Sequence, residues 1–282
     1  MHNIEHQRLL IPVLRHYNRE LKRHGARAKG VLWRDAEGAA RRFRVLSQIL
    51  PVSDCTAPFD SSGAACTTVH DFGCGYGALF HFLSEHPVMQ SGGSYLGTDM
   101  SEDMLSAARE LVSDQRARFA YGVGAAEPAE YTMVSGTFNL KSNVDDGTWS
   151  AFVQESLREL WKQTHKGLAF NLLHDNSPQQ NSSLYYADAR SWHRFARTLT
   201  PHAELLVPAT RAGIVTALGM AVGTPVSTMM PIGSTGTLSA DESAASELLR
   251  AVLGPAGIRM EPGLPSTDIT ILMSRQAPSR IP

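Results

Sequence analysis

Hydrophobic positions recur at helical spacing along the first fifty residues of the chain. In the first stretch these positions are Leu9, Leu10, Val13, Leu14, Tyr17 and Leu21. A second helical stretch runs over residues 35–50 and is ended by Pro51, because proline cannot continue a helix. The pattern therefore predicts an N-terminal helical segment over residues 1–50, which we expect to fold over the rest of the chain as a lid.

Beyond residue 51, short apolar runs alternate with helical patterns, which is typical of a mostly parallel sheet covered by helices on both faces. The runs that predict strands are residues 67–72, 94–99, 118–123, 131–138, 167–173, 203–207 and 268–273. Helices are predicted over residues 78–86, behind the capping residue Ser101, and between Trp149 and Trp161. We expect an α/β domain of about seven strands, with a ligand-binding core over residues 51–209.

A long segment, residues 210–267, separates the last two predicted strands. A connection of that length without secondary structure is uncommon in a compact domain. Ser239 and Glu242 have the spacing of a capping box, and an apolar helical face follows them. Met220, Met229, Met230 and Met260 would give this segment an adaptable apolar surface. We predict an inserted subdomain that serves as a lid or a homodimer interface, with residues 268–282 forming the final strand and tail.

The composition of the chain disfavours several kinds of binding partner. Lys and Arg number 26 against 27 Asp and Glu, so the net charge of −1 provides no overall field toward nucleic acid or anionic membranes. The three cysteines lack metal-ligand spacing and suit reduced thiols. The N-terminus has no apolar signal-peptide core, and no stretch reaches the roughly 18 apolar residues of a membrane span. We expect a cytoplasmic protein that acts on a small molecule.

A glycine-rich turn, D-F-G-C-G-Y-G at residues 71–77, follows the first predicted strand. Glycines let the backbone turn tightly and approach a ligand. Asp71 precedes the first glycine and can accept a hydrogen bond from a ligand ammonium group, whereas it would repel a pyrophosphate. Asp99 ends the second strand, where its carboxylate can accept both hydroxyls of a ribose.

The same turn also satisfies the dinucleotide pattern G-x-G-x-x-[GA] through Gly73, Gly75 and Ala78. A NAD(P)-dependent oxidoreductase is therefore an alternative, which Asp71 and the sequence over residues 135–139 disfavour. A non-catalytic cofactor-binding partner or sensor is a second alternative.

The turn resembles the D-x-G-x-G-x-G motif of the class I S-adenosylmethionine-dependent methyltransferases. Four further segments are similar to a bacterial subgroup of that family: K-G-V-L-W at residues 29–33, R-F at 42–43, S-G-T-F-N-L-K at 135–141 and L-Y-Y-A-D at 184–188. The resemblance covers roughly residues 17–188. It implies a Rossmann-like fold, S-adenosylmethionine as cofactor, S-adenosylhomocysteine as product, and methylation of a small-molecule acceptor in bacterial specialised metabolism.

By that resemblance, Gly73, Gly75 and Gly77 would line the methionine part of the cofactor, Asp99 would hold the ribose, and Met100 would flank the adenine. The other residues assigned to cofactor binding are Asp71, Met104, Ser135, Trp33, Tyr17 and Arg42. For Arg42 we expect a bidentate pair with the cofactor carboxylate. The turn over residues 122–126 lacks the family's usual acidic residue near the adenine amine, so backbone groups or Glu127 would substitute.

Methyl transfer from a sulfonium is an in-line displacement, so the protein mainly has to align the acceptor and exclude water. We predict O-methylation of a hydroxyl or a carboxylate. His174 follows the fifth strand at the ligand edge and is the predicted base, with Asp175 and Tyr185 as further catalytic residues; a purely structural role for His174 stays open. Residues 135–137 provide no acidic ligand to complete a cation site with Asp175, so no metal is predicted.

Overall fold

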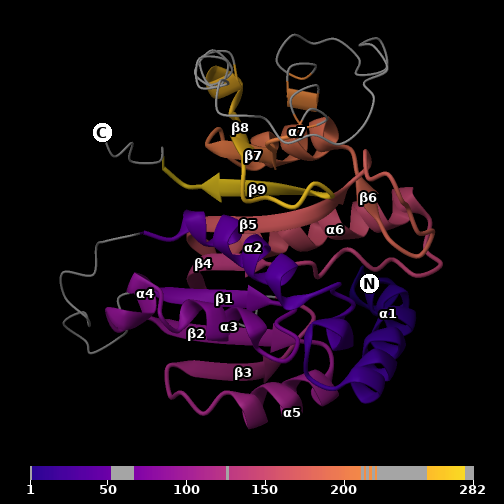
Figure 1. Cartoon of the computed structure of the whole chain (residues 1–282), viewed down its shortest axis with the longest axis vertical. Helices are drawn as coiled ribbons and strands as arrows, with labels where there is room; N and C mark the ends of the chain where they lie inside the picture. The colour runs from indigo at the N-terminus through magenta and orange to yellow at the C-terminus, as the bar shows by residue number, and fades with distance from the viewer. Residues whose placement is uncertain are drawn as a thin grey trace.

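The computed structural model describes residues 2–51, 67–124, 127–210 and 253–276, together with the single residues 213, 216, 217 and 220. Within these ranges the strands form one sheet in the order β3-β2-β1-β4-β5-β9-β7-β8, and β6 pairs with β5 off this path (Figure 1). The strands are β1 (Thr68–Phe72), β2 (Ser94–Asp99), β3 (Ala117–Tyr121), β4 (Ala129–Val134), β5 (Thr164–His174), β6 (Tyr186–Ala187), β7 (Ala203–Pro208), β8 (Ile258–Glu261) and β9 (Asp268–Ser274).

The helices lie before and between these strands. They are α1 (His2–His24), α2 (Ala36–Leu46), α3 (Ala78–Leu83), α4 (Pro87–Gln90), α5 (Glu102–Leu111), α6 (Asp146–Lys162) and α7 (Ala189–Leu199), with short 3-10 turns η1 (Ala28–Val31), η2 (Ser47–Ile49) and η5 (Gly254–Ala256). Helix α7 was not predicted from the sequence. None of the described helices is long and apolar enough to cross a membrane.

The direction of the strands positions the ligand edge. Strands β3, β2, β1, β4 and β5 run parallel, whereas β9 is antiparallel to both β5 and β7. The strand order reverses between β1 and β4, and open α/β sheets bind ligands outside the carboxyl ends of their strands at such a point. The predicted fold class, a Rossmann-like α/β sheet that is mostly parallel, is confirmed. The short strands β6 and β8 extend it beyond the predicted seven.

Helices cover both faces of the sheet. Side chains of α6 and α7 pack in one apolar cluster with Phe170 and Leu172 of β5, and side chains of α2, α3 and α4 pack in a second cluster with Ala169. Neighbouring residues of a strand point to opposite faces, so these two clusters are the two faces of the sheet. Each strand of the centre is therefore buried on both sides.

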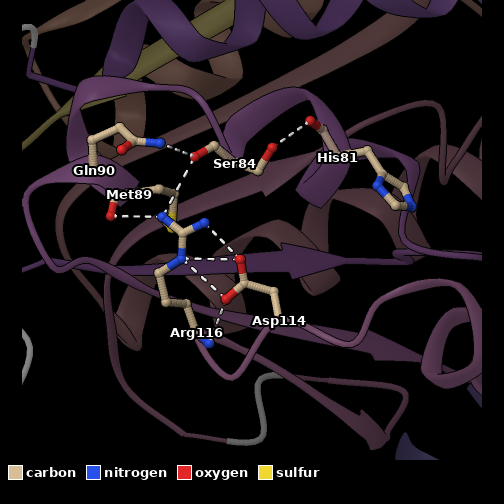
Figure 2. Close-up of polar contacts among 6 residues, drawn as sticks. All are labelled: His81, Ser84, Met89, Gln90, Asp114 and Arg116. Atoms are coloured by element: carbon tan, nitrogen blue, oxygen red, sulfur yellow. Dashed lines mark hydrogen bonds and ion pairs between the residues drawn. The ribbon is translucent and has the colours of Figure 1, made fainter.

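Arg116 lies at the amino-terminal edge of the sheet, just before β3 (Figure 2). Its Nε donates to Asp114 Oδ1 at 3.0 Å and its Nη2 to Asp114 Oδ2 at 2.6 Å. Its Nη1 donates to the carbonyl of Met89 on α4 at 3.0 Å. The guanidinium thus ties α4 to the start of β3, far along the strands from the ligand edge.

Helix α1 contacts the opposite end of the sheet. Ser101 Oγ, at the start of α5, donates to Asn18 Oδ1 at 2.6 Å, and Lys22 lies 3.7 Å from Asp103. The N-terminal segment is therefore fastened next to the carboxyl end of β2.

The division of the chain into residues 1–50, 51–209, 210–267 and 268–282 remains a prediction. The capping box at Ser239, the helix expected behind it, and Met229 and Met230 lie outside the described residues, as do residues 277–282. Within the predicted insertion, η5 and β8 are described, and β8 pairs parallel to β7. That part of the segment extends the sheet.

Candidate active site

The glycine turn joins β1 to α3. Gly73, Gly75 and Gly77 have φ values of +76°, +55° and +83°, a region that favours glycine. A Cβ on Gly73 would lie 2.3 Å from Thr137 Cγ2, so the backbone of the turn passes directly against the residues after β4. At Gly77, the N-cap of α3, a Cβ would meet Phe119 at 3.2 Å. The turn has this shape only with glycine at these positions.

Two carboxylates flank the turn. Asp99 Oδ2 accepts a hydrogen bond from the Gly75 amide, and Asp99 Oδ1 accepts one from the Ser101 amide, both at 2.9 Å. Asp71 Oδ2 accepts a hydrogen bond of 2.6 Å from the Tyr95 hydroxyl. These bonds hold both carboxylates at the carboxyl ends of β1 and β2.

The surroundings of these carboxylates disfavour their ionised forms. Burial raises the pKa of Asp71 to about 7, against the opposing effect of the Tyr95 hydrogen bond and with a further contribution from the charge of Asp99. Burial also raises the pKa of Asp99. A ligand with positive charge would favour the ionised carboxylates, because opposite charges stabilise each other most where water is excluded.

A cavity with about 990 Å³ of empty space, its open mouth included, lies at this edge of the sheet. Aliphatic and aromatic side chains form most of its wall: Leu10, Val13, Leu14, Val31, Phe43, Phe72, Leu79, Val123, Phe138, Trp149 and Phe152. Its charged lining residues are Asp71 and Asp99, and within the described ranges no Lys, Arg or His lines it. The cavity therefore suits a ligand that combines positive charge with an apolar body.

All residues assigned to cofactor binding from the sequence line this cavity, except Gly77 and Arg42. Those that line it are Tyr17, Trp33, Asp71, Gly73, Gly75, Asp99, Met100, Met104 and Ser135. Gly122 and Val123 also line it, whereas Glu127 does not and instead pairs with Arg118. Among these groups Ser135 Oγ is buried and has no hydrogen-bond partner in the described part of the chain.

Arg42 is directed elsewhere. Its Nε and Nη2 donate to the two carboxylate oxygens of Asp268 at the start of β9, the second at 3.0 Å. The bidentate geometry expected for Arg42 is present, with a carboxylate of the chain itself as its partner.

The residues assigned to catalysis lie outside the cavity lining. His174 ends β5 and is 5% exposed, and its Nδ1 accepts a hydrogen bond of 2.9 Å from the Asn176 amide. Burial lowers the pKa of His174 and so favours the neutral imidazole. Asp175 Oδ1 lies 3.3 Å from His174 Nδ1, and the Tyr185 hydroxyl accepts a hydrogen bond of 2.9 Å from Trp192. The structure does not bring this group to the glycine turn.

The cavity also contains residues that were not assigned to it from the sequence. Leu10, Val13 and Leu14 share a helical face with Tyr17, and this periodicity was recognised only as helix packing. For Trp149 and Phe152 of α6 the sequence predicted only that they belong to a helix. No local motif marks an apolar position as the wall of a cavity, since the same pattern serves ordinary packing.

The glycine turn after β1, the acidic residue that ends β2 and the strand reversal beside them define the site of a class I S-adenosylmethionine-dependent methyltransferase. Comparison with known proteins gives the same class. A family model described as a methyltransferase domain matches residues 69–167. The chain is 31% identical over 124 residues to Rv1506c of Mycobacterium tuberculosis, a protein named as a methyltransferase, across 43% of this chain and 73% of that protein. The chain belongs to the class I S-adenosylmethionine-dependent methyltransferase family.

Solved structures of methyltransferases are also similar to the chain. Magnesium protoporphyrin IX methyltransferase from Synechocystis PCC 6803, with bound S-adenosylhomocysteine, is 13% identical with a TM-score of 0.45, over 85% of this chain and 84% of that one. Phosphoethanolamine N-methyltransferase 1 from Haemonchus contortus is 14% identical with a TM-score of 0.47, over 66% of this chain and 40% of that one. Similarity at this level assigns no acceptor to the chain.

Proposed function

We propose that this methyltransferase transfers the methyl group of S-adenosylmethionine to a hydroxyl oxygen of a small, largely apolar acceptor in bacterial specialised metabolism. The observation that carries the proposal is the composition of the cavity. Its described wall is aliphatic and aromatic, and its charged lining residues are the two carboxylates Asp71 and Asp99.

The residues present fit the cofactor. S-adenosylmethionine supplies an electrophilic methyl group on a sulfonium and carries an ammonium group. In this proposal Asp71 accepts a hydrogen bond from the ammonium, and Asp99 accepts hydrogen bonds from the ribose hydroxyls. Ser135 Oγ, which is buried without a partner among the described residues, donates to the cofactor carboxylate. Asp71, directly before the first glycine, would repel the pyrophosphate of a nicotinamide cofactor, so the oxidoreductase alternative has little support.

The remaining wall belongs to the acceptor in this proposal. Leu10 and Leu14 of α1 line the cavity together with Phe138, Trp149 and Phe152. Such a wall excludes water and orients a flat or branched apolar body beside the methyl group. A carboxylate acceptor would need a cation to compensate its buried charge, and the described lining contains none. We therefore favour a hydroxyl acceptor over a carboxylate.

The described lining also contains no imidazole or amine that could serve as a base. The acceptor hydroxyl is then one that ionises readily, such as a phenol or an enol, because a positioned base is least needed there. In this proposal His174, Asp175 and Tyr185 support the ends of β5 and β6 and do not remove the proton.

The proposal is tested with purified protein, S-adenosylmethionine and a panel of phenols, enols, alkyl alcohols, carboxylic acids and amines of matched size. Products are identified by mass spectrometry, and S-adenosylhomocysteine release is measured for each compound. We expect methyl ethers from apolar phenols or enols. Methyl esters or N-methyl products as the main outcome would contradict the proposal. S-adenosylhomocysteine binding without turnover of any compound would favour the cofactor-binding sensor.

A further inference from the structure

The ion pair between Arg42 and Asp268 is buried beside the cavity. The Arg42 side chain is 15% exposed and the Asp268 side chain is fully buried. Asp268 accepts two further hydrogen bonds, from Thr267 Oγ1 at 2.8 Å and from Asn171 Nδ2 at 3.3 Å. Both carboxylate oxygens are therefore each held by two donors, and the orientation of the group is fixed.

Asn171 connects this pair to the wall of the cavity. It lies on β5, is 1% exposed, and its Oδ1 accepts a hydrogen bond of 2.9 Å from the amide of Gly136. Gly136 lines the cavity and has a φ of +69°. The three residues 135–137, which we call the 135–137 turn, are thus fastened to Arg42 through two side chains. Ser135, whose Oγ has no partner within the described ranges, is part of this turn.

Trp33 is held by the same group of residues. The Arg42 guanidinium lies 5.9 Å from the centre of the Trp33 ring, a cation–π distance. The indole also approaches Gly136 so closely that a Cβ there would lie 3.1 Å from Trp33 Nε1. Trp33 lines the cavity. One arginine therefore contacts two parts of the wall, the indole directly and the turn through Asp268.

A role in stability alone does not account for this arrangement. Replacing a buried ion pair by apolar residues of similar volume is often neutral, since the desolvation of both charges offsets their attraction. A planar guanidinium paired at both oxygens of a carboxylate does define a geometry that a flexible ammonium cannot.

We propose that Arg42, Asp268 and Asn171 are positioning residues for methyl transfer: they hold Trp33 and the 135–137 turn in the one geometry that the cofactor requires. The inference rests on the proposed cofactor site. None of the three lines the cavity, and each acts through Trp33 or the 135–137 turn, which do.

The test compares Arg42→Lys with Arg116→Lys. Arg42→Lys keeps the positive charge but loses the planar guanidinium that donates to both oxygens of Asp268. Arg116 also donates to both carboxylate oxygens of an aspartate, Asp114, at the opposite edge of the sheet (Figure 2), so Arg116→Lys is a control for the loss of such a pair away from the cavity. Asn171→Leu keeps both bonds between Arg42 and Asp268 and removes the two bonds of Asn171, one with the Gly136 amide and one with Asp268. Measurements are the dissociation constant of S-adenosylhomocysteine, kcat, KM, the melting temperature, and the Trp33 emission identified by difference from Trp33→Phe.

We expect Arg42→Lys and Asn171→Leu each to weaken S-adenosylhomocysteine binding about tenfold or more, and to lower kcat/KM by up to about 100-fold, because small misplacements of a site have effects of this order. Their combination should cost less than the product of the two, since both act on the same turn. The Trp33 emission should shift in Arg42→Lys. Arg116→Lys should leave affinity and emission within about twofold of the original.

Unchanged affinity in both Arg42→Lys and Asn171→Leu would overturn the inference, as would equal losses in Arg42→Lys and Arg116→Lys. If Arg42→Lys does not fold, Asn171→Leu decides by itself. A lack of S-adenosylhomocysteine binding in the original chain would overturn the proposed cofactor site and this inference with it, and it is seen before any variant is compared.

Discussion

Asp99 performs two tasks through one carboxylate. It accepts hydrogen bonds from the amides of Gly75 and Ser101, which hold the glycine turn against β2, and it faces the cavity where a ribose would lie. A hydrogen bond from a ribose hydroxyl to a charged carboxylate contributes about 1.5–3 kcal/mol to binding. We expect Asp99→Ala to weaken S-adenosylhomocysteine binding by this amount, measured by calorimetry.

Asp103→Ala is the control for this change. Asp103 lies one turn further along, is 43% exposed, and pairs with Lys22 at 3.7 Å. Its removal takes away a nearby carboxylate without touching the cavity, so binding should stay near that of the original chain. Equal affinity in Asp99→Ala and Asp103→Ala would contradict the assignment of Asp99.

His174 gives a second prediction at this scale. Its Nδ1 is occupied by the Asn176 amide and its side chain does not line the cavity. We expect His174→Gln to leave the pH profile of kcat/KM unchanged and the rate within about threefold, whereas loss of a general base would cost roughly 10²–10⁴-fold. A rate limb below pH 6.5 that disappears in the variant would restore His174 as the base.

Among the elements of the site, the glycine turn has little freedom to change. Gly73→Ala would place a Cβ 2.3 Å from Thr137 Cγ2 at a φ of +76°. Overpacking and a positive φ together should lower the free energy of unfolding by about 2–4 kcal/mol and weaken the cofactor site. A Cβ on Gly254 would meet nothing within 4 Å, so Gly254→Ala should stay within about 0.5 kcal/mol. Denaturant unfolding measures both; similar values would show that the turn can shift.

How far the sequence predicts an element depends on whether its signal is local. Strand β2 was predicted with its exact bounds, since an apolar run ends there at Asp99. Helix α7 has an amphipathic pattern that includes the buried Trp192 and Phe195. It was not predicted, although it directly follows the L-Y-Y-A-D segment at residues 184–188. Strand β8 shows its only buried side chain at Ile258, so its existence depends on pairing with β7.

In the candidate site, too, some features have local sequence signals and others depend on tertiary contacts. The glycine turn and the two carboxylates follow from a motif and from the ends of strands. The partner of Arg42 lies 226 positions away, and no local pattern could indicate that the expected carboxylate belongs to the chain and not to the cofactor. The position of His174 outside the cavity lining likewise depends on tertiary packing.

For the whole molecule, the buried carboxylates couple cofactor binding to pH. The pKa of Asp71, ordinarily 3.8, is raised by burial to about 7 in the ligand-free chain. A bound ammonium favours the ionised form, so binding below pH 7 must release a proton. We expect S-adenosylhomocysteine affinity to rise by up to about tenfold per pH unit from pH 5 to 7 and then to level off.

The raised pKa of Asp71 also makes the stability of the ligand-free fold depend on pH. A carboxyl whose folded pKa is raised contributes stability that is present below pH 3.8 and is lost as the pH rises to about 7. Burial lowers the pKa of His70 to about 4, which has the opposite effect between pH 4 and 6.5. His70 contributes equally to the melting temperature with and without S-adenosylhomocysteine. The difference between the two melting temperatures therefore reports only the groups of the cavity. Asp71→Asn should abolish the pH dependence of binding; a slope that persists would assign it to another group.

The antiparallel direction of β9 brings its first residue, Asp268, to the ligand edge, and this has a consequence for the order of synthesis. A ribosome adds about 5–20 residues per second, so Arg42 emerges about 10–45 s before the carboxylate with which it pairs. During that interval the growing polypeptide already contains the glycine turn and both cavity carboxylates. Arg42 lacks its carboxylate partner until the start of β9 has been translated. We therefore expect unfinished chains on the ribosome to bind the cofactor weakly, and tight binding to begin only after residue 268 has left the exit tunnel.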